Sequence, residues 1–202
     1  MMERFFGKQV TNIDLGGSER TAGIATFSTE QKRGLERLGY KFIYPLTGQS
    51  IATLRDAGNK FWSSWHKGAA IEAVTSMHTE VALNPTALFL SGSNRKTLTE
   101  QLAIVSRFNK ALGKEVPGVV AKLGGVSDYA ELAFAHQRAT GDKLFGSKYN
   151  YDYTRTTTPS GGSVVALVGN FDVNGLHVDS LHPDGGGDDV WASPLVVPAS
   201  AR

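Results

Sequence analysis

Two histidines and four aspartates lie between residues 177 and 189. His177 and Asp179 are two residues apart, so on a strand both side chains point to the same face, and His182 and Asp184 follow on a loop. Imidazole nitrogen with carboxylate oxygen can hold a divalent metal such as Ca²⁺ or Zn²⁺. We therefore predict a metal site at these four residues, which would serve a metal-assisted hydrolase. The alternative is a polar strand face followed by a turn, because Asp and Gly are frequent in turns without any ligand.

A second group of residues has the composition of an anion site. Ser93, Arg95, Lys96 and Thr97 lie between a predicted buried strand and a predicted helix. Backbone amides at the start of a helix attract anions, and the two cationic side chains would add charge. This loop is predicted to bind phosphate or a nucleotide, although it lacks the glycine that precedes the lysine in nucleotide-binding loops of the Walker type. The alternative is a solvated turn in which Thr97 and Glu100 form a capping box.

Aromatic residues provide a third candidate, a recognition surface. Tyr149, Tyr151 and Tyr153 alternate as on one face of a strand, and Trp191 lies on the last predicted strand. Phe61, Trp62 and Trp65 form a further bulky group. Such rings can bind sugars or a partner protein, whereas the alternative is that they pack in the core.

Composition excludes several kinds of chemistry. The chain has no cysteine, which rules out disulfides, Cys-ligated zinc and thiol nucleophiles. Its net charge of +2 disfavours nucleic-acid binding, but the charge is divided, with +6 on residues 1–150 and −4 on residues 151–202. Opposite charges on the two segments fit head-to-tail self-association. No apolar run is long enough to span a bilayer or resembles a signal peptide, so we expect a protein kept in the cytoplasm or released without a signal.

The elements that must position these groups follow from helix caps, apolar spacing and turn residues. Residues 1–148 predict a mixed body of helices and strands, and residues 149–198 predict an antiparallel meander, together one domain of the α+β class. The predicted helices span 29–38, 51–57, 98–112 and 128–139. The predicted strands span 40–46, 86–90 and 117–123 in the body, and 149–154, 164–171, 176–180 and 190–197 in the meander.

The segment 165–198 resembles the end of bacterial C-type-lectin-like modules. The likeness rests on Val168-Gly169-Asn170-Phe171-Asp172, Gly175 to Asp179, Asp188 to Ala192 and Pro194 to Val197. The resemblance implies ligand or protein recognition through the 180–189 loop, with calcium as a candidate ligand there. It implies no catalytic residue.

From these observations we expect a non-enzymatic recognition or assembly protein that binds a protein or carbohydrate partner through its C-terminal sheet and loop. The first alternative is the metal-assisted hydrolase. The second is a phosphate or nucleotide binder that uses loop 91–97.

Overall fold

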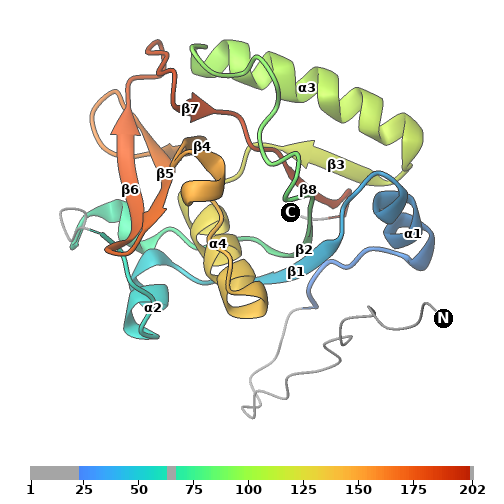
Figure 1. Cartoon of the computed structure of the whole chain (residues 1–202), viewed down its shortest axis with the longest axis horizontal. Coiled ribbons are helices and arrows are strands. Elements are labelled where there is room, and N and C mark those ends of the chain that lie inside the picture. The colour runs from blue at the N-terminus through green and yellow to red at the C-terminus, as the bar shows by residue number, and fades with distance from the viewer. Residues whose placement is uncertain (1–22, 63–66, 201–202) are drawn as a thin grey trace.

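The described residues, 23–62 and 67–200, form two four-stranded sheets in the computed structural model (Figure 1). The strands of the first sheet are β1 (Phe42–Thr47), β2 (His78–Leu83), β3 (Val119–Lys122) and β8 (Leu195–Pro198). Their order is β1-β2-β8-β3, and all neighbours run antiparallel.

The second sheet is formed by the C-terminal third of the chain. Its strands are β4 (Tyr153–Pro159), β5 (Val165–Asp172), β6 (Gly175–Leu181) and β7 (Val190–Trp191). Their order is β6-β5-β4-β7; β4, β5 and β6 form an antiparallel meander, and β7 pairs parallel to β4.

Four α-helices and two short 3₁₀ helices accompany the sheets. They are α1 (Thr29–Arg37), α2 (Ile51–Asp56), α3 (Leu98–Glu115), α4 (Val126–Thr140), and the 3₁₀ helices Ala70–Ala73 and Ser147–Tyr149. Ser28, Ser50 and Thr97 begin α1, α2 and α3 with capping boxes, in which the side chain accepts from an amide three residues later. These local signals were readable from the sequence, and the α+β class is confirmed.

Helix α4 forms the centre of the core, because it contacts β1 of the first sheet and β4 and β5 of the second (Figure 1). Every residue from 126 to 134 is buried, including two carboxylates. Asp128 accepts hydrogen bonds from the Met77 and Gly125 amides, both at 2.7 Å, and Glu131 accepts one from the Thr47 amide at 3.0 Å. Burial raises the pKa of Asp128. Since their oxygens hold neighbouring loops, these carboxylates have a structural role.

Two predicted strands differ from the structure. The strand predicted at 86–90 is wrong: this run is an irregular loop, because Asn84 Oδ1 accepts from the Thr86 amide at 3.1 Å and turns the chain after Pro85. The strand predicted at 190–197 is two strands, β7 and β8, which belong to different sheets. The final strand therefore joins the body rather than extending the meander.

The stretch 149–154 is also not one strand. Asn150 and Tyr151 have φ values of +53° and +59°, in the left-handed region, so the side chains there do not alternate between two faces. Among the described residues, no helix is long and apolar enough to cross a membrane.

Candidate functional site

The predicted metal ligands are not brought together. In the ranges 23–62 and 67–200, no group of three or more His, Asp or Glu side chains could hold a metal ion. His182 Nδ1 lies 3.7 Å from Asp184 Oδ2 on the exposed loop after β6, while Asp179 Oδ1 accepts from the Ser180 amide at 2.7 Å. His177 instead lies 3.7 Å from Asp172. The four-residue site is therefore not formed, because β6 ends at Leu181 and the loop carries His182 and Asp184 away.

Tyr153 and His177, predicted for two different sites, meet on the second sheet. Both pair with Gly169 of the intervening strand β5, and the missing side chain there lets the Tyr153 hydroxyl approach His177 Nδ1 to 3.3 Å. Trp62 stacks on the imidazole with ring centres 4.6 Å apart. Burial lowers the pKa of His177 against the opposing effect of Asp172, so the ring is neutral near pH 7.

The predicted anion loop is bonded to the protein itself. Ser93 is buried, and its hydroxyl donates to Leu90 O at 2.6 Å and accepts from the Ala192 amide at 2.9 Å. The Arg95 amide donates to Gly187 O at 2.8 Å, and the Leu98 amide donates to Pro183 O at 2.7 Å. This arrangement does not support an anion site, because carbonyl oxygens of the 182–187 loop already occupy these amides.

The side chains of the anion loop are engaged as well. Thr97 caps α3 in a capping box with Glu100, as predicted by the alternative in which this loop is a solvated turn. Lys96 Nζ lies 3.7 Å from Glu100, and Arg95 Nη2 lies 3.7 Å from Asp188 on the exposed surface.

A buried arginine connects the predicted anion loop with the 182–187 loop, which were predicted as parts of two separate sites. Arg155 on β4 is fully buried. Its Nε donates to Gln101 Oε1 at 2.9 Å, Nη1 to His182 O at 3.1 Å, and Nη2 to Lys96 O at 3.3 Å and Gly185 O at 2.6 Å. We call Arg155 with these four acceptors the Arg155 clasp. None of the acceptors is a carboxylate, so the guanidinium charge is stabilised by neutral oxygens alone.

The predicted aromatic row is wrong, because its tyrosines have separate environments. Tyr149 donates to Pro85 O at 3.0 Å and meets Phe89 edge-on, with ring centres 6.3 Å apart. Trp191 stacks on the same Phe89 at 5.8 Å. Tyr151 is 43% exposed. Tyr149 and Trp191 therefore both pack against Phe89. Trp65, named with Phe61 and Trp62 as a further aromatic group, lies outside the described residues.

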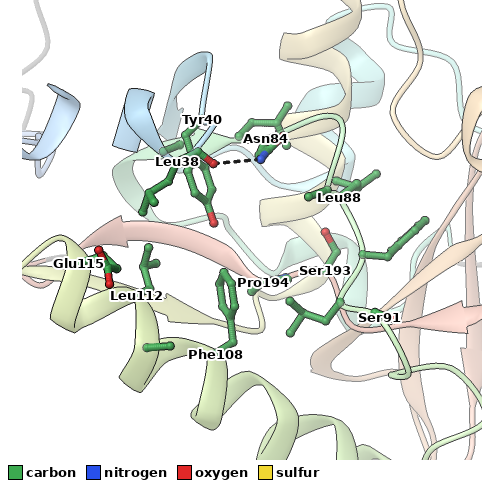
Figure 2. Close-up of a pocket in the computed structure, with 16 residues that line it drawn as sticks. Leu38, Tyr40, Asn84, Leu88, Ser91, Phe108, Leu112, Glu115, Ser193 and Pro194 are labelled. Atoms are coloured by element: carbon green, nitrogen blue, oxygen red, sulfur yellow. Dashed lines mark hydrogen bonds between the residues drawn. The ribbon is translucent and has the colours of Figure 1, made fainter. Parts of the chain in front are cut away.

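Phe89 forms part of the wall of a mostly apolar cavity of about 530 Å³ (Figure 2). One wall is α3, from which Phe108 and Leu112 face the cavity, and the opposite wall is the loop 84–91. Tyr40 projects into the space between them, while Ser193 and Pro194 line it beside β8. We call this space the α3 cavity.

The sequence explains why the α3 cavity is not filled. The apolar residues of α3 are only partly covered: Val105 and Leu112 are buried, Phe108 is half-buried, and Leu102, outside the cavity lining, is 43% exposed. The run 87–90 passes the groove as a loop, and all four of its residues line the cavity. Apolar side chains from both segments therefore face a shared open space.

The α3 cavity contains few polar groups. None of its sixteen lining residues is His, Lys, Arg or Asp, and Glu115 is the one acidic side chain among them. Burial raises the pKa of Tyr40 to about 12, so its phenol stays protonated. A smaller hollow of about 340 Å³ beside α4 contains Lys60 and Lys143, but both ammonium groups already donate to carbonyl oxygens of the β5–β6 turn.

Sequence reasoning missed Tyr40, Phe108, Glu115 and Arg155. Phe108 lies in the predicted helix 98–112, and the spacing of apolar residues does not tell whether a partner covers each one. The charge of Arg155 within a stretch of threonines was the one available signal that this side chain has a special environment.

No protein-family model, curated protein or solved structure matches the chain. The likeness of residues 165–198 to C-type-lectin-like modules therefore stays a prediction.

Proposed function

We propose that this protein is a non-enzymatic recognition protein that binds a small, largely apolar molecule in the α3 cavity. The observation that carries the proposal is the size and lining of that space. About 530 Å³ falls within the ~300–1,000 Å³ typical of small-molecule sites, which are mostly apolar with a few polar groups. An apolar ligand would bury the exposed faces of Phe89 and Phe108 and gain affinity from the area removed from water.

The scarcity of titratable groups in the α3 cavity supports binding without a reaction, because Glu115 and Tyr40 are the only such groups in its lining. Acid–base catalysis needs a group whose pKa lies near the working pH. The lining residues include no histidine, and the phenol of Tyr40 has a pKa of about 12. The Tyr153–His177 pair lies in the other sheet and is not part of this lining.

A cavity-filling substitution tests the proposal. Ala111 lines the cavity and is exposed, so Ala111→Trp should fill the space without disturbing the core. Ala103 is also exposed on α3 but lies outside the cavity, and Ala103→Trp is the matched control. Calorimetric titration with n-octanol should show binding to the wild type and to Ala103→Trp, and its loss in Ala111→Trp. Equal binding by all three proteins, or by none, would refute the proposal.

A second candidate keeps recognition at the C-terminal sheet. Trp62 is 53% exposed although it stacks on His177, and Asn170 and Asp179 lie on the neighbouring strands. A flat ring beside hydrogen-bonding groups suits a sugar face. We propose a carbohydrate as the ligand of this surface. A glycan array read with the wild type and Trp62→Ala tests it, and signals that do not depend on Trp62 would refute it.

Self-association stays a further proposal, supported by the +6 and −4 charges of the two segments. Attraction between unlike charges weakens with salt. Sedimentation should therefore show a mass that rises with concentration and falls with added salt. A constant monomer mass would refute this proposal.

A further inference from the structure

We infer that the α3 cavity selects ligands that carry a cationic, amine-type group on their apolar body, held at the Glu115 end. This inference rests on the proposed function. In Figure 2, Glu115 lies at one end of the cavity and Ser91 at the other, with the apolar side chains between them. An elongated ligand would therefore place its charged end at Glu115 and its apolar body along Phe108 and Leu88.

The charges around the cavity favour a cation. Glu115 is the last residue of α3, so its carboxylate lies at the helix end where the macrodipole is negative. At 100° per residue, Lys110 points about 140° and Lys114 about 100° away from the direction of Glu115. Both lie outside the lining, so no cationic side chain there neutralises the carboxylate.

The aromatic ring of Tyr40 adds a second, independent reason. Tyr40 projects into the cavity from the side opposite α3 (Figure 2). The π face of such a ring attracts ammonium groups. Phe108 lies two helical turns before Glu115, about 10 Å along α3, so it contacts the apolar body of the ligand instead. Within the part of the chain that the structure describes, no hydrogen bond engages the Tyr40 hydroxyl, so its oxygen can accept one from an N–H donor.

Three ligands of equal chain length separate this inference from the proposed function. They are n-octylamine, which is protonated at pH 7, n-octanol, which is neutral, and octanoate, which is an anion. Calorimetric titration in low salt should rank them in that order, with octylamine about fivefold tighter than octanol, as a partly exposed charge pair provides. The preference should shrink at high salt.

Glu115→Gln should reduce the octylamine-to-octanol affinity ratio to near one, while octanol binding is unchanged. Asp56→Asn removes the same charge from an exposed residue of α2 and should keep the ratio. If no ligand binds, the proposed function fails. If all three bind alike, or the ratio survives in Glu115→Gln, the choice of a cationic ligand is overturned and the proposed function stands.

Discussion

Replacement of Arg155 by methionine should lower the free energy of unfolding by about 3 kcal/mol, because buried acceptors lose their donor. Gln101 Oε1 is fully buried and has no other donor in the described hydrogen-bond network. Without the arginine, His182 O still accepts a hydrogen bond from the Gly185 amide, at 2.9 Å in the wild type. Lys96 O and Gly185 O belong to partly exposed residues and can regain water. An orphaned buried acceptor costs about 1–3 kcal/mol, so Gln101 with partial losses at the two loop carbonyls gives the stated magnitude.

The opposing effect is the desolvation of the guanidinium, which methionine would relieve. Apolar replacement of buried charges is neutral or stabilising in some proteins. Arg155→Lys separates the two effects, because it keeps the charge but cannot reach all four acceptors with a single ammonium. If the acceptors dominate, both variants lose stability. If desolvation dominates, Arg155→Met is at least as stable as the wild type.

Urea denaturation of the wild type and both variants gives the free energies, and hydrogen exchange reports on the 182–187 loop. Exchange of the Gly185 amide should accelerate in both variants, since this loop is held by the Arg155 clasp. Arg107→Met changes an exposed arginine of α3 and should stay within about 0.5 kcal/mol of the wild type. A loss below 1 kcal/mol in Arg155→Met with unchanged loop exchange would refute the reasoning.

Three further predictions concern titration, backbone space and metals. Burial lowers the pKa of His136, so the unfolded state binds a proton at higher pH than the folded state. The free energy of unfolding should therefore fall as the pH drops below about 6.5. In urea denaturation at several pH values, His136→Gln should show a weaker dependence of this free energy on pH. A Cβ at Gly169 would lie 2.5 Å from Asp152 O, so Gly169→Ala should lower the melting temperature, whereas Gly113→Ala in α3, with open space around it, should raise it. Ca²⁺, Zn²⁺ or a chelator should leave the melting temperature unchanged, because no metal cluster forms in the described residues, and a shift of several degrees would contradict this.

Local features of the fold could be predicted because their causes are local. Ser28 and Thr97 each bond an amide three residues away, and the β5–β6 hairpin closes on the tight turn that ends at Gly175. The strand predicted at 86–90 is wrong because an apolar run indicates that its side chains are buried, but does not determine the backbone conformation in which they are buried.

The candidate sites were harder to predict because their contacts are distant in sequence. Arg155 bonds to Gln101, which lies 54 residues earlier in the sequence. Tyr40 and Phe108 line the same cavity, which the spacing of residues along the chain does not predict. His177 and Asp179 share a strand as predicted, but whether side chains converge depends on how the loop after Leu181 leaves the sheet. The contact between Tyr153 and His177 could not be predicted, because it depends on the register of three strands.

The position of β8 has a consequence for biosynthesis. β3 has no strand neighbour in the described sheet other than β8, so the first sheet stays incomplete until residues 195–198 have left the ribosome. Helices α1 and α3 can form early, but the cluster that buries Leu35 and Leu112 stays incomplete without Val196 of this late strand, since chains emerge N-terminus first. Nascent chains stalled before residue 195 should therefore remain protease-sensitive and depend on chaperones.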